Sequence, residues 1–167
     1  MRRTDCASGS QMKCIKYVRL DDVDPAGLAI LLNRKKIREH LIEHRLFTVD
    51  TVKHWVRTKL KEDSLPGCRV RAILADHQLA GWCGLQLDGN RYEIAIVIDE
   101  GHWGLGRRVF QDVMGWAREL GHEAVLIHLL HTRPQYRFLR KIAKSVYKSE
   151  VVGNEFTTYE LTVRQDP

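Results

Sequence analysis

The chain has 167 residues, a length that fits about one domain with a substantial core. Its 44% hydrophobic and 29% charged residues are typical of a globular protein, and its net charge of +6 suits an anionic cofactor, RNA or acidic proteins without selecting one. No apolar run approaches the roughly 18 residues of a membrane span, and no apolar segment follows the basic Arg2 and Arg3 as in a signal peptide, so we expect a cytoplasmic protein without a membrane partner.

The N-terminal residues 1–11 are small and polar without periodicity, and we predict a disordered leader there. Neither an internal repeat nor a low-complexity tract interrupts the rest of the chain, so a single domain is expected over residues 12–167. The four cysteines have no C-x-x-C spacing. This spread favours separate, reduced thiols over a zinc clip or a redox pair.

Hydrophobic periodicity predicts the elements of the N-terminal half. Residues 14–20 alternate as a strand does, and Asp24 before Pro25 is typical of a helix N-cap followed by the first helical residue. The basic connector 34–45 leads to a second helix, because four apolar residues share one face at helical spacing: Val52, Trp55, Val56 and Leu60.

Three strands that pair as an antiparallel meander are expected next, at 69–75, 78–87 and 91–98. The dipeptide Asp76-His77 joins the first two strands. The dipeptide Asp88-Gly89 is a strong signal for a type I′ hairpin between the second strand and the third.

The C-terminal half begins with an amphipathic helix after Gly106, whose apolar face is Val109, Phe110, Val113, Met114, Ala117 and Leu120. A buried strand at 124–130 follows, and then a helix over 133–143. Two strands complete the chain, at 145–152 and 156–163. The first of these two helices is a crossover, which makes the strands before and after it parallel neighbours. This order predicts an α/β (α+β) fold with a mixed, mostly antiparallel sheet of about seven strands and about four helices.

A glycine-containing turn joins the strand 91–98 to the helix that begins at Gly106, an arrangement that aims unpaired backbone N–H groups at an anion. Gly104 and Gly106 lack a Cβ, so a pyrophosphate could approach closely, and Arg107 and Arg108 add cations. The spacing fits neither a P-loop nor a Rossmann turn. A plain tight turn is the alternative interpretation.

The segment Gly104-Leu105-Gly106-Arg107 matches the core of the pattern Q/R-x-x-G-x-G/A, with Gly101 in the place of the first residue. This pattern is the acetyl-CoA-binding segment of the GNAT superfamily of N-acetyltransferases, which the chain resembles over about 16–163. The opening at 31–55 looks like the branch of ribosomal-protein N-terminal acetyltransferases and polyamine acetyltransferases. The predicted order of elements is also the GNAT order, and the resemblance implies a GNAT-like fold and acetyl-CoA as co-substrate.

The resemblance also implies which residues hold acetyl-CoA. The pantetheine arm would bind the backbone of three strand residues: Ile96, Val97 and Ile98. Thr132 stands where the family has an Asn that contacts the same arm. The pyrophosphate would lie on the turn formed by Gly101, His102, Trp103, Gly104, Leu105, Gly106, Arg107 and Arg108. Arg137 and Arg140 could meet the 3′-phosphate, with a solvated basic helix face as the alternative.

Acetyl transfer from a thioester needs an unprotonated amine, a polarised carbonyl and a thiolate that can leave. Glu93 lies on the strand that leads to the turn, where the superfamily often keeps a Glu general base, and burial would raise the pKa of its carboxyl. A solvated or cross-strand-paired carboxylate is the alternative. The family's acid is a Tyr that aligns with Leu139, so Tyr136, one helical turn earlier, is the candidate acid, with His131 or solvent as alternatives.

The segment His40-Leu41-Ile42-Glu43-His44 matches the metalloprotease motif H-x-x-E-H. A protease would also need a second helix with an acidic third ligand in a large domain, so we expect no metal site and interpret the segment as a polar helix face. Contact with substrate is the alternative role, since the resemblance places the acceptor groove here. His128 and His131 resemble another ligand pair, but in a strand they point to opposite faces.

The sequence thus predicts an acetyl-CoA-dependent N-acetyltransferase that transfers the acetyl group directly to a primary amine. The acceptor is a protein N-terminus, a small amine or polyamine, or an aminoacyl-tRNA, and the resemblance allows a homodimer. The rival hypothesis is a non-catalytic CoA-binding or RNA-interaction module that keeps the fold. The departures from the family pattern at Gly101 and Leu139 favour that rival, and Glu93 opposes it.

Overall fold

The computed structural model describes residues 13–41 and 44–164. The leader expected at 1–11 lies outside these ranges, as do Ile42 and Glu43 of the H-x-x-E-H segment. No helix in the described ranges is long and apolar enough to cross a membrane. In chain order the elements are β1 (Ile15–Val18), η1 (Leu20–Asp22), α1 (Pro25–Leu32), α2 (Lys35–Arg38), α3 (Val49–Asp63), β2 (Arg69–Ala75), β3 (Gln78–Asp88), β4 (Arg91–Ile98), η2 (Glu100–Leu105), α4 (Gly106–Glu119), β5 (Ala124–Leu130), α5 (Arg137–Ile142), β6 (Ala143–Val151) and β7 (Asn154–Thr162).

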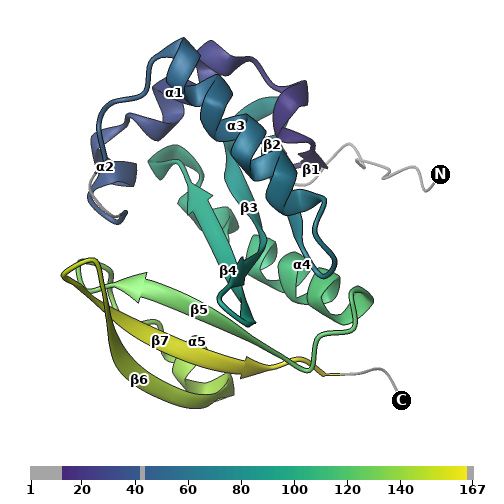
Figure 1. Cartoon of the computed structure of the whole chain (residues 1–167), viewed down its shortest axis with the longest axis vertical. Helices are drawn as coiled ribbons and strands as arrows, with labels where there is room; N and C mark the ends of the chain where they lie inside the picture. Colours follow the sequence, from purple (N-terminus) through teal and green to yellow (C-terminus); the bar gives the residue numbers. More distant parts are fainter. Residues whose placement is uncertain (1–12, 42–43, 165–167) are drawn as a thin grey trace.

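The strands of the described ranges form one seven-stranded sheet in the order β1-β2-β3-β4-β5-β7-β6. Every neighbouring pair is antiparallel except β4 and β5, which are parallel and are joined by the crossover helix α4. Figure 1 shows β1 to β4 in one half of the molecule and β5, β7 and β6 in the other. The predicted fold class is therefore confirmed, with α2 as one short helix more than predicted, inside the basic connector.

The two faces of the sheet bury separate hydrophobic clusters, because side chains alternate along each strand. One cluster joins α1 and α3 to the strand residues Val70, Ala72, Trp82 and Val97. The other joins α4 and α5 to the strand residues Ile73, Cys83, Leu85, Ile94 and Ile127. From the predicted apolar face of α4, Val109, Phe110, Val113 and Ala117 are buried, while Met114 and Leu120 pack at the edge of the cluster.

The hairpin between β3 and β4 differs from the predicted type I′ turn. Asp88 still belongs to the ladder, where it pairs with Arg91, so the two loop residues are Gly89 and Asn90. Within this loop φ is positive only at Gly89 (62°). That pattern fits a type II′ turn, because a type I′ turn needs positive φ at both loop residues. The I′ pattern occurs instead at Asp76 and His77, with φ of 48° and 69°.

The helix predicted over 133–143 is shorter in the structure, because α5 begins only at Arg137. Tyr136 is its N-cap residue, with extended dihedral angles (φ −88°, ψ 116°). The prediction that Tyr136 lies on the helix, one turn before Leu139, is therefore wrong. The residue before the predicted start, Thr132, forms a long-range hydrogen bond with the Glu39 carbonyl, a contact that local signals do not include.

The cysteines depart in part from the expectation of reduced thiols. Cys68 and Cys83 are free and buried, whereas Cys14 is disulfide-bonded. Burial raises the pKa of both free thiols. A raised pKa disfavours the thiolate, which is the reactive form of a cysteine.

Asn33 fastens the connection between α1 and α3 with two side-chain hydrogen bonds. Its Nδ2 donates to the Phe47 carbonyl at 2.8 Å, and the Phe47 N–H donates to its Oδ1 at 2.7 Å. We expect Asn33→Ala to lower the free energy of unfolding by about 1–3 kcal/mol, because the Phe47 groups lose their partner. Urea denaturation measures this loss. Asn90→Ala, in the exposed β3–β4 loop, is the control, and equal midpoints for the two variants would contradict the assignment.

Candidate active site

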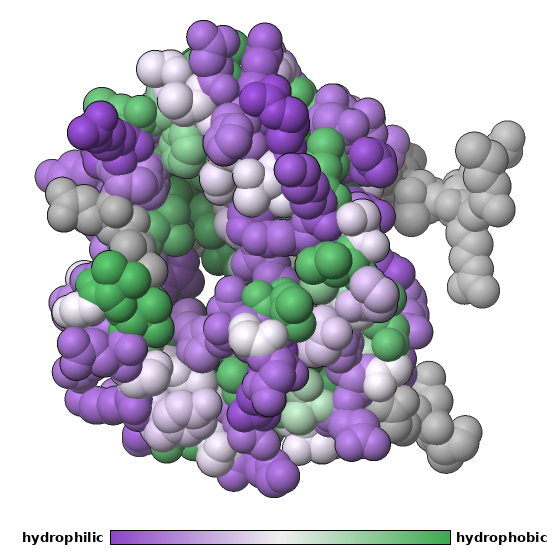
Figure 2. Space-filling view, in the orientation of Figure 1, coloured by the Kyte–Doolittle hydropathy of each residue, from purple (hydrophilic) through white to green (hydrophobic). Residues whose placement is uncertain are grey.

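The parallel strands β4 and β5 stay together over only two residue pairs. Glu93 pairs with Leu126 and Ile94 pairs with Ile127, after which residues 95–98 have no ladder partner on β5. Figure 1 shows the two strands diverging from this point. Figure 2, in the same orientation, shows the surface hollowed between the half of the molecule that carries β4 and the half that carries β5. The fold thus opens a gap inside its own sheet.

Two residues of β4 present their backbone groups to this gap. The Asp99 N–H donates to the Ala80 carbonyl at 2.8 Å, on the β3 side. Because backbone groups alternate between the two sides of a strand, Val97 also faces β3, whereas Ile96 and Ile98 face the gap. The Ile98 carbonyl accepts a hydrogen bond from Trp103 Nε1 at 3.1 Å. Of the three strand residues predicted to bind the pantetheine arm, only Ile96 and the N–H of Ile98 therefore face the gap with unpaired backbone groups among the described residues.

The predicted glycine turn is helical in the structure. Residues 100–105 form the 3₁₀ helix η2, which continues into α4 without a break. Gly106 has helical dihedral angles (φ −56°, ψ −42°), and its N–H donates to the Trp103 carbonyl. Its N–H is therefore not directed at a ligand, and the first N–H groups of the helical run belong instead to Glu100 and Gly101.

The two glycines of this turn matter for the space above them rather than for their conformation. A Cβ placed on Gly104 or Gly106 would meet nothing within 4 Å. Gly101 and Gly104 are exposed, Leu105 is half-buried, and Trp103 keeps half of its surface exposed. A flat, open surface thus lies beside the end of β4, where a phosphate-bearing ligand could approach the backbone.

A buried acidic residue marks the start of the helical run. Asp99 forms an ion pair with Arg34, which comes from the connection between α1 and α2. His102 lies on the same side, with its Nδ1 3.7 Å from Asp99 Oδ2, and this buried Nδ1 has no hydrogen-bond partner among the described residues. Arg34 therefore neutralises a negative charge that would otherwise oppose an anion at this end of the gap.

The predicted cations fall into two groups. The Arg107 guanidinium lies 5.3 Å from the centre of the Phe138 ring on α5, and Arg137 and Arg140 of the same helix are exposed. Arg108 points elsewhere, because its Nη1 donates to the Lys13 carbonyl at 3.4 Å. Arg107 thus contacts α5, the helix that carries Arg137 and Arg140, whereas Arg108 contacts the segment before β1.

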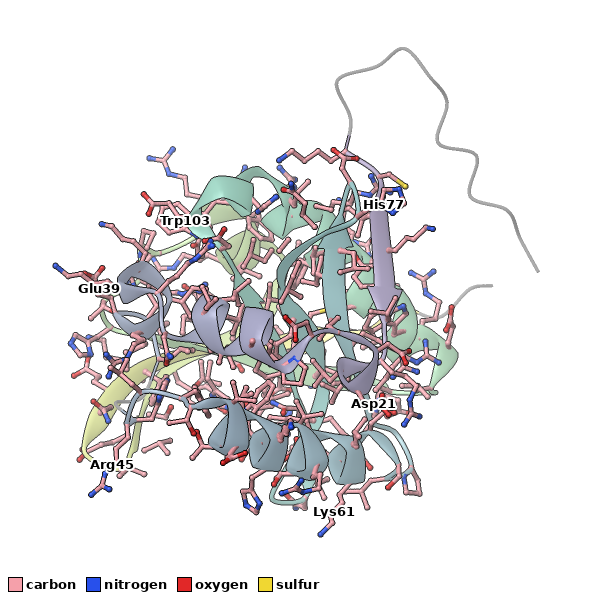
Figure 3. All side chains as sticks on the ribbon, turned by 90° about the horizontal axis from the view of Figure 1, so that it is seen from above. Asp21, Glu39, Arg45, Lys61, His77 and Trp103 are labelled. Atoms are coloured by element: carbon pink, nitrogen blue, oxygen red, sulfur yellow. The ribbon has the colours of Figure 1, made fainter. Side chains whose placement is uncertain are left out.

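The segment around α2 bridges the gap. The Thr132 hydroxyl donates to the Glu39 carbonyl at 2.9 Å, and His40 Nδ1 lies 3.0 Å from the Thr132 hydroxyl oxygen. To contact pantetheine as predicted, the Thr132 hydroxyl would have to give up these contacts. Figure 3 shows Glu39, Arg45 and Trp103 at one end of the molecule, with Asp21 and His77 at the other. The side of the gap near α2 is thus partly closed by the chain itself.

The H-x-x-E-H interpretation as a polar helix face does not hold for its described residues. α2 ends at Arg38, and His40 and His44 lie outside helices. His40 contacts Thr132, whereas His44 Nδ1 lies 2.8 Å from the Arg45 carbonyl. The two imidazoles therefore have separate partners.

Glu93 belongs to a cluster of polar side chains that sequence patterns did not reveal. His128 Nε2 lies 2.9 Å from Asp88 Oδ2 and 3.6 Å from Glu93 Oε2. Glu93 Oε1 accepts a hydrogen bond from Gln86 Nε2 at 3.5 Å, and Gln86 Oε1 accepts one from Lys59. Burial is the main cause that raises the pKa of Glu93, and the positive charge of His128 opposes the rise. The predicted direction of this pKa shift is confirmed.

The two predicted catalytic residues face different sides of the sheet. Glu93 points toward α3, as its proximity to Lys59 and Glu62 shows. Tyr136 packs against the cluster under α4 and α5, with its ring centre 6.1 Å from that of Phe138. Leu139, in the place of the family's acid, is buried in the same cluster. The structure therefore gives no direct contact between Glu93 and Tyr136.

One group of described residues has the composition of a metal site. Asp88, Glu93 and His128 each offer a ligand atom, and these atoms lie within 4.8 Å of one another. Asp88 is largely exposed, with 48% of its side chain accessible. His128 Nε2 already hydrogen-bonds to Asp88 Oδ2 and lies within ion-pair distance of Glu93 Oε2, so the three side chains are partners of one another.

A second hollow lies far from this site, at the outer edge of the sheet. It has a volume of about 520 Å³ and is lined by β1, β2 and Trp116. Its arginines are already paired, Arg69 with Glu119 at 2.8 Å and Arg71 with Asp63 at 2.7 Å. None of the residues that the sequence singled out for chemistry lines it.

A scan against protein-family models and a search of curated proteins gave no match. Solved structures do match. A protein from Bordetella pertussis described as a GNAT-family acetyltransferase is 13% identical over 91% of this chain and 100% of that chain, with a TM-score of 0.72. An N-acetyltransferase from Staphylococcus aureus Mu50 is 13% identical over 92% of this chain and 100% of that chain, with a TM-score of 0.65.

A third similar structure contains a ligand. It is a protein from Salmonella typhimurium, described as an acetyltransferase and solved with its cofactor acetyl-CoA. It is 15% identical over 94% of this chain and 97% of that chain, with a TM-score of 0.60. At such identities the likeness concerns the fold, and the chain shares the fold of GNAT acetyltransferases.

Proposed function

We propose that the protein is an acetyl-CoA-dependent N-acetyltransferase that transfers the acetyl group directly to a primary amine. The observation that carries this proposal is the gap in the sheet, where β4 leaves β5 after Ile94. It exposes a polar strand edge between Glu93 and the helical run that begins after Asp99. The fold shared with acetyltransferases, one of them solved with acetyl-CoA, supports the same function.

In this proposal the strand edge holds the pantetheine arm. That arm contains two amide groups, which can pair with the backbone groups of Ile96 and Ile98 as an added strand would. Acetyl-CoA supplies an activated thioester carbonyl for the transfer. Because β3 pairs with the other edge of β4 along its whole length, the edge facing the gap is rigid. A rigid edge can orient a flexible arm at a low entropic cost.

The helical run would receive the phosphates. Its first N–H groups, at Glu100 and Gly101, carry the partial positive charge of a helix N-terminus. The open surface above Gly104 and Gly106 leaves room for the pyrophosphate. The exposed guanidinium of Arg107, with those on α5, would meet the remaining phosphate.

Glu93 would accept the proton that the amine loses as it attacks the carbonyl. A general base works best when its pKa approaches the working pH, and burial moves the pKa of Glu93 in that direction. Because Tyr136 packs on the opposite side of the sheet from Glu93, solvent is the candidate that protonates the departing thiolate. The function is tested by incubating the protein with acetyl-CoA and an added amine. The release of free CoA thiol and the acetylation of the amine are measured together.

A CoA-binding module without turnover is the second candidate function. The observations that favour it are the buried Leu139 in the place of the family's acid and the engaged hydroxyl of Thr132. This alternative predicts that CoA binds while no amine gains an acetyl group. Binding and transfer, measured on the same preparation, separate the two candidates.

We expect the purified protein to contain no stoichiometric metal and to keep its fold and activity in EDTA. The reason is that His128 Nε2 already donates to Asp88 at 2.9 Å, so the atoms that could ligate a cation satisfy one another. Elemental analysis with circular dichroism and activity measurements checks this. Stoichiometric zinc that disappears in His128→Ala or His40→Ala would contradict it.

A further inference from the structure

His128 reaches Glu93 because of the register between β4 and β5. Glu93 pairs with Leu126, and side chains on one face of a strand recur every second residue, so His128 is the next β5 residue on that face. The β4 residue beside it would be Ala95, whose small side chain leaves room for the imidazole. The ring thus turns back toward Glu93, with 3.6 Å between Nε2 and Oε2.

The partners of the ring determine where its hydrogens lie. Nε2 faces oxygens of Asp88 and Glu93, and an ionised carboxylate only accepts hydrogen bonds, so Nε2 carries a hydrogen. Nδ1 lies 2.7 Å from the hydroxyl of Thr158, which is fully buried and lies 2.9 Å from Ser149 Oγ. Thr158 can accept from Nδ1 and donate to Ser149. Both ring nitrogens therefore have a partner in the cluster.

The carboxylate of Glu93 is held at both oxygens. Oε2 faces His128, and Oε1 accepts from Gln86 Nε2 at 3.5 Å. Gln86 is itself fixed, because its Oε1 accepts from Lys59, whose ammonium lies 5.0 Å from the centre of the Trp82 ring. The orientation of the base is thus set by β3, β5 and α3 together.

The charged groups around Glu93 act in opposite directions on its pKa. Burial raises it most, and Asp88 on β3 and Glu62 on α3 raise it further. His128 on β5 and Lys59 on α3 lower it. On the β7 side, Glu160 is paired with Arg91 at 3.3 Å. Among the charges that favour ionised Glu93, His128 has the larger effect.

We propose that His128 is a positioning residue for Glu93, which it holds oriented through a cluster that includes Asp88 and Thr158. The effect of His128 on catalysis rests on the proposed function. The cluster of His128, Glu93, Asp88 and Thr158 does not depend on that function. Without His128, the pKa of Glu93 would lose a contribution that lowers it and would rise further. Asp88 has the opposite effect on the same carboxyl.

The direct test is a titration of the Glu93 carboxyl by ¹³C NMR in protein labelled at glutamate Cδ. His128→Gln removes the positive charge, so the midpoint of Glu93 moves to higher pH. Asp88→Asn removes a negative charge, so the midpoint moves to lower pH. His54→Gln, an exposed histidine of α3, is the matched control and leaves the midpoint unchanged. An unchanged Glu93 midpoint in His128→Gln overturns the proposal. If His128→Gln folds poorly, the Glu93 midpoint in Asp88→Asn tests the cluster independently.

The kinetic test uses the same variants. In His128→Gln the acid limb of the kcat/KM profile moves to higher pH. The rate at pH 7 falls by about tenfold, which is less than the whole rate enhancement of about 10²–10⁴-fold that a general base contributes. The KM for acetyl-CoA stays at the wild-type value. A fall in rate that is equal at every pH overturns the positioning role. If the NMR midpoints move as expected and wild-type protein transfers nothing, the cluster stands and the proposed function fails.

Discussion

Gly106→Val is expected to remove most of the stabilisation that acetyl-CoA gives to the native protein. A ligand at about 100 times its Kd stabilises the native state by about 2.7 kcal/mol. For a chain of this size that is a rise in Tm of roughly 5–10 °C, which differential scanning fluorimetry measures. The valine side chain would occupy the open space above the turn that the pyrophosphate needs. The variant itself should fold, because a Cβ at Gly106 meets nothing within 4 Å and φ is helical.

The helix α4 offers a matched control for this variant. A Cβ at Gly115 also meets nothing within 4 Å, and Gly115 lies more than two helical turns further along α4. Gly115→Val should therefore keep the shift. Arg107→Ala should weaken it, and salt should weaken it too, since an exposed cation is screened. Wild-type protein that shows no shift with acetyl-CoA or with CoA would contradict the cofactor site.

Glu93→Gln is expected to lower kcat by about 10²-fold or more at neutral pH while leaving acetyl-CoA binding intact, with partial recovery at higher pH where the free amine is commoner. Because burial raises the pKa of Glu93, wild-type activity should fall, as the pH is lowered, at a higher pH than an ordinary Glu would give. The variant should lack this acid limb. A full pH–rate profile of both proteins measures the effect.

The control for Glu93 is a carboxylate outside the cluster. Glu155 lies exposed on β7 and pairs with Lys148 at 2.8 Å, an interaction that lowers the pKa of Glu155. Glu155→Gln should show the wild-type profile. A Glu93→Gln profile with the same acid limb as wild type would remove Glu93 from the mechanism.

Sequence patterns predicted the elements whose signals are local. The strands at 69–75, 91–98 and 124–130 were predicted with the bounds that the structure has, because each is an apolar run bounded by turn residues. The helix α4 followed from the spacing of its buried residues. The seven-stranded sheet then followed from the order of these elements. At this level, local propensity and tertiary structure agree.

The parts that were missed depend on contacts between distant residues. Just before the region where α5 starts later than predicted, Thr132 contacts Glu39, 93 positions away in sequence. The role of His128 depends on a register between two strands that α4 separates, and no spacing in the sequence encodes it. Gly106 was expected in the glycine-containing turn, yet its dihedral angles are helical, since glycine in a turn pattern does not reveal its φ.

The most direct test of the proposed function is the transfer itself. Wild-type protein is incubated with acetyl-CoA and a panel of peptides with free N-termini, small amines, polyamines and aminoacyl-tRNA. Thiol release and the mass of each acceptor are recorded together. We predict that one class gains a single acetyl group, in step with free CoA, and that Glu93→Gln slows both. Acetyl-CoA that binds at the turn but yields no acetylated acceptor and no thiol above the uncatalysed rate would contradict the proposed function.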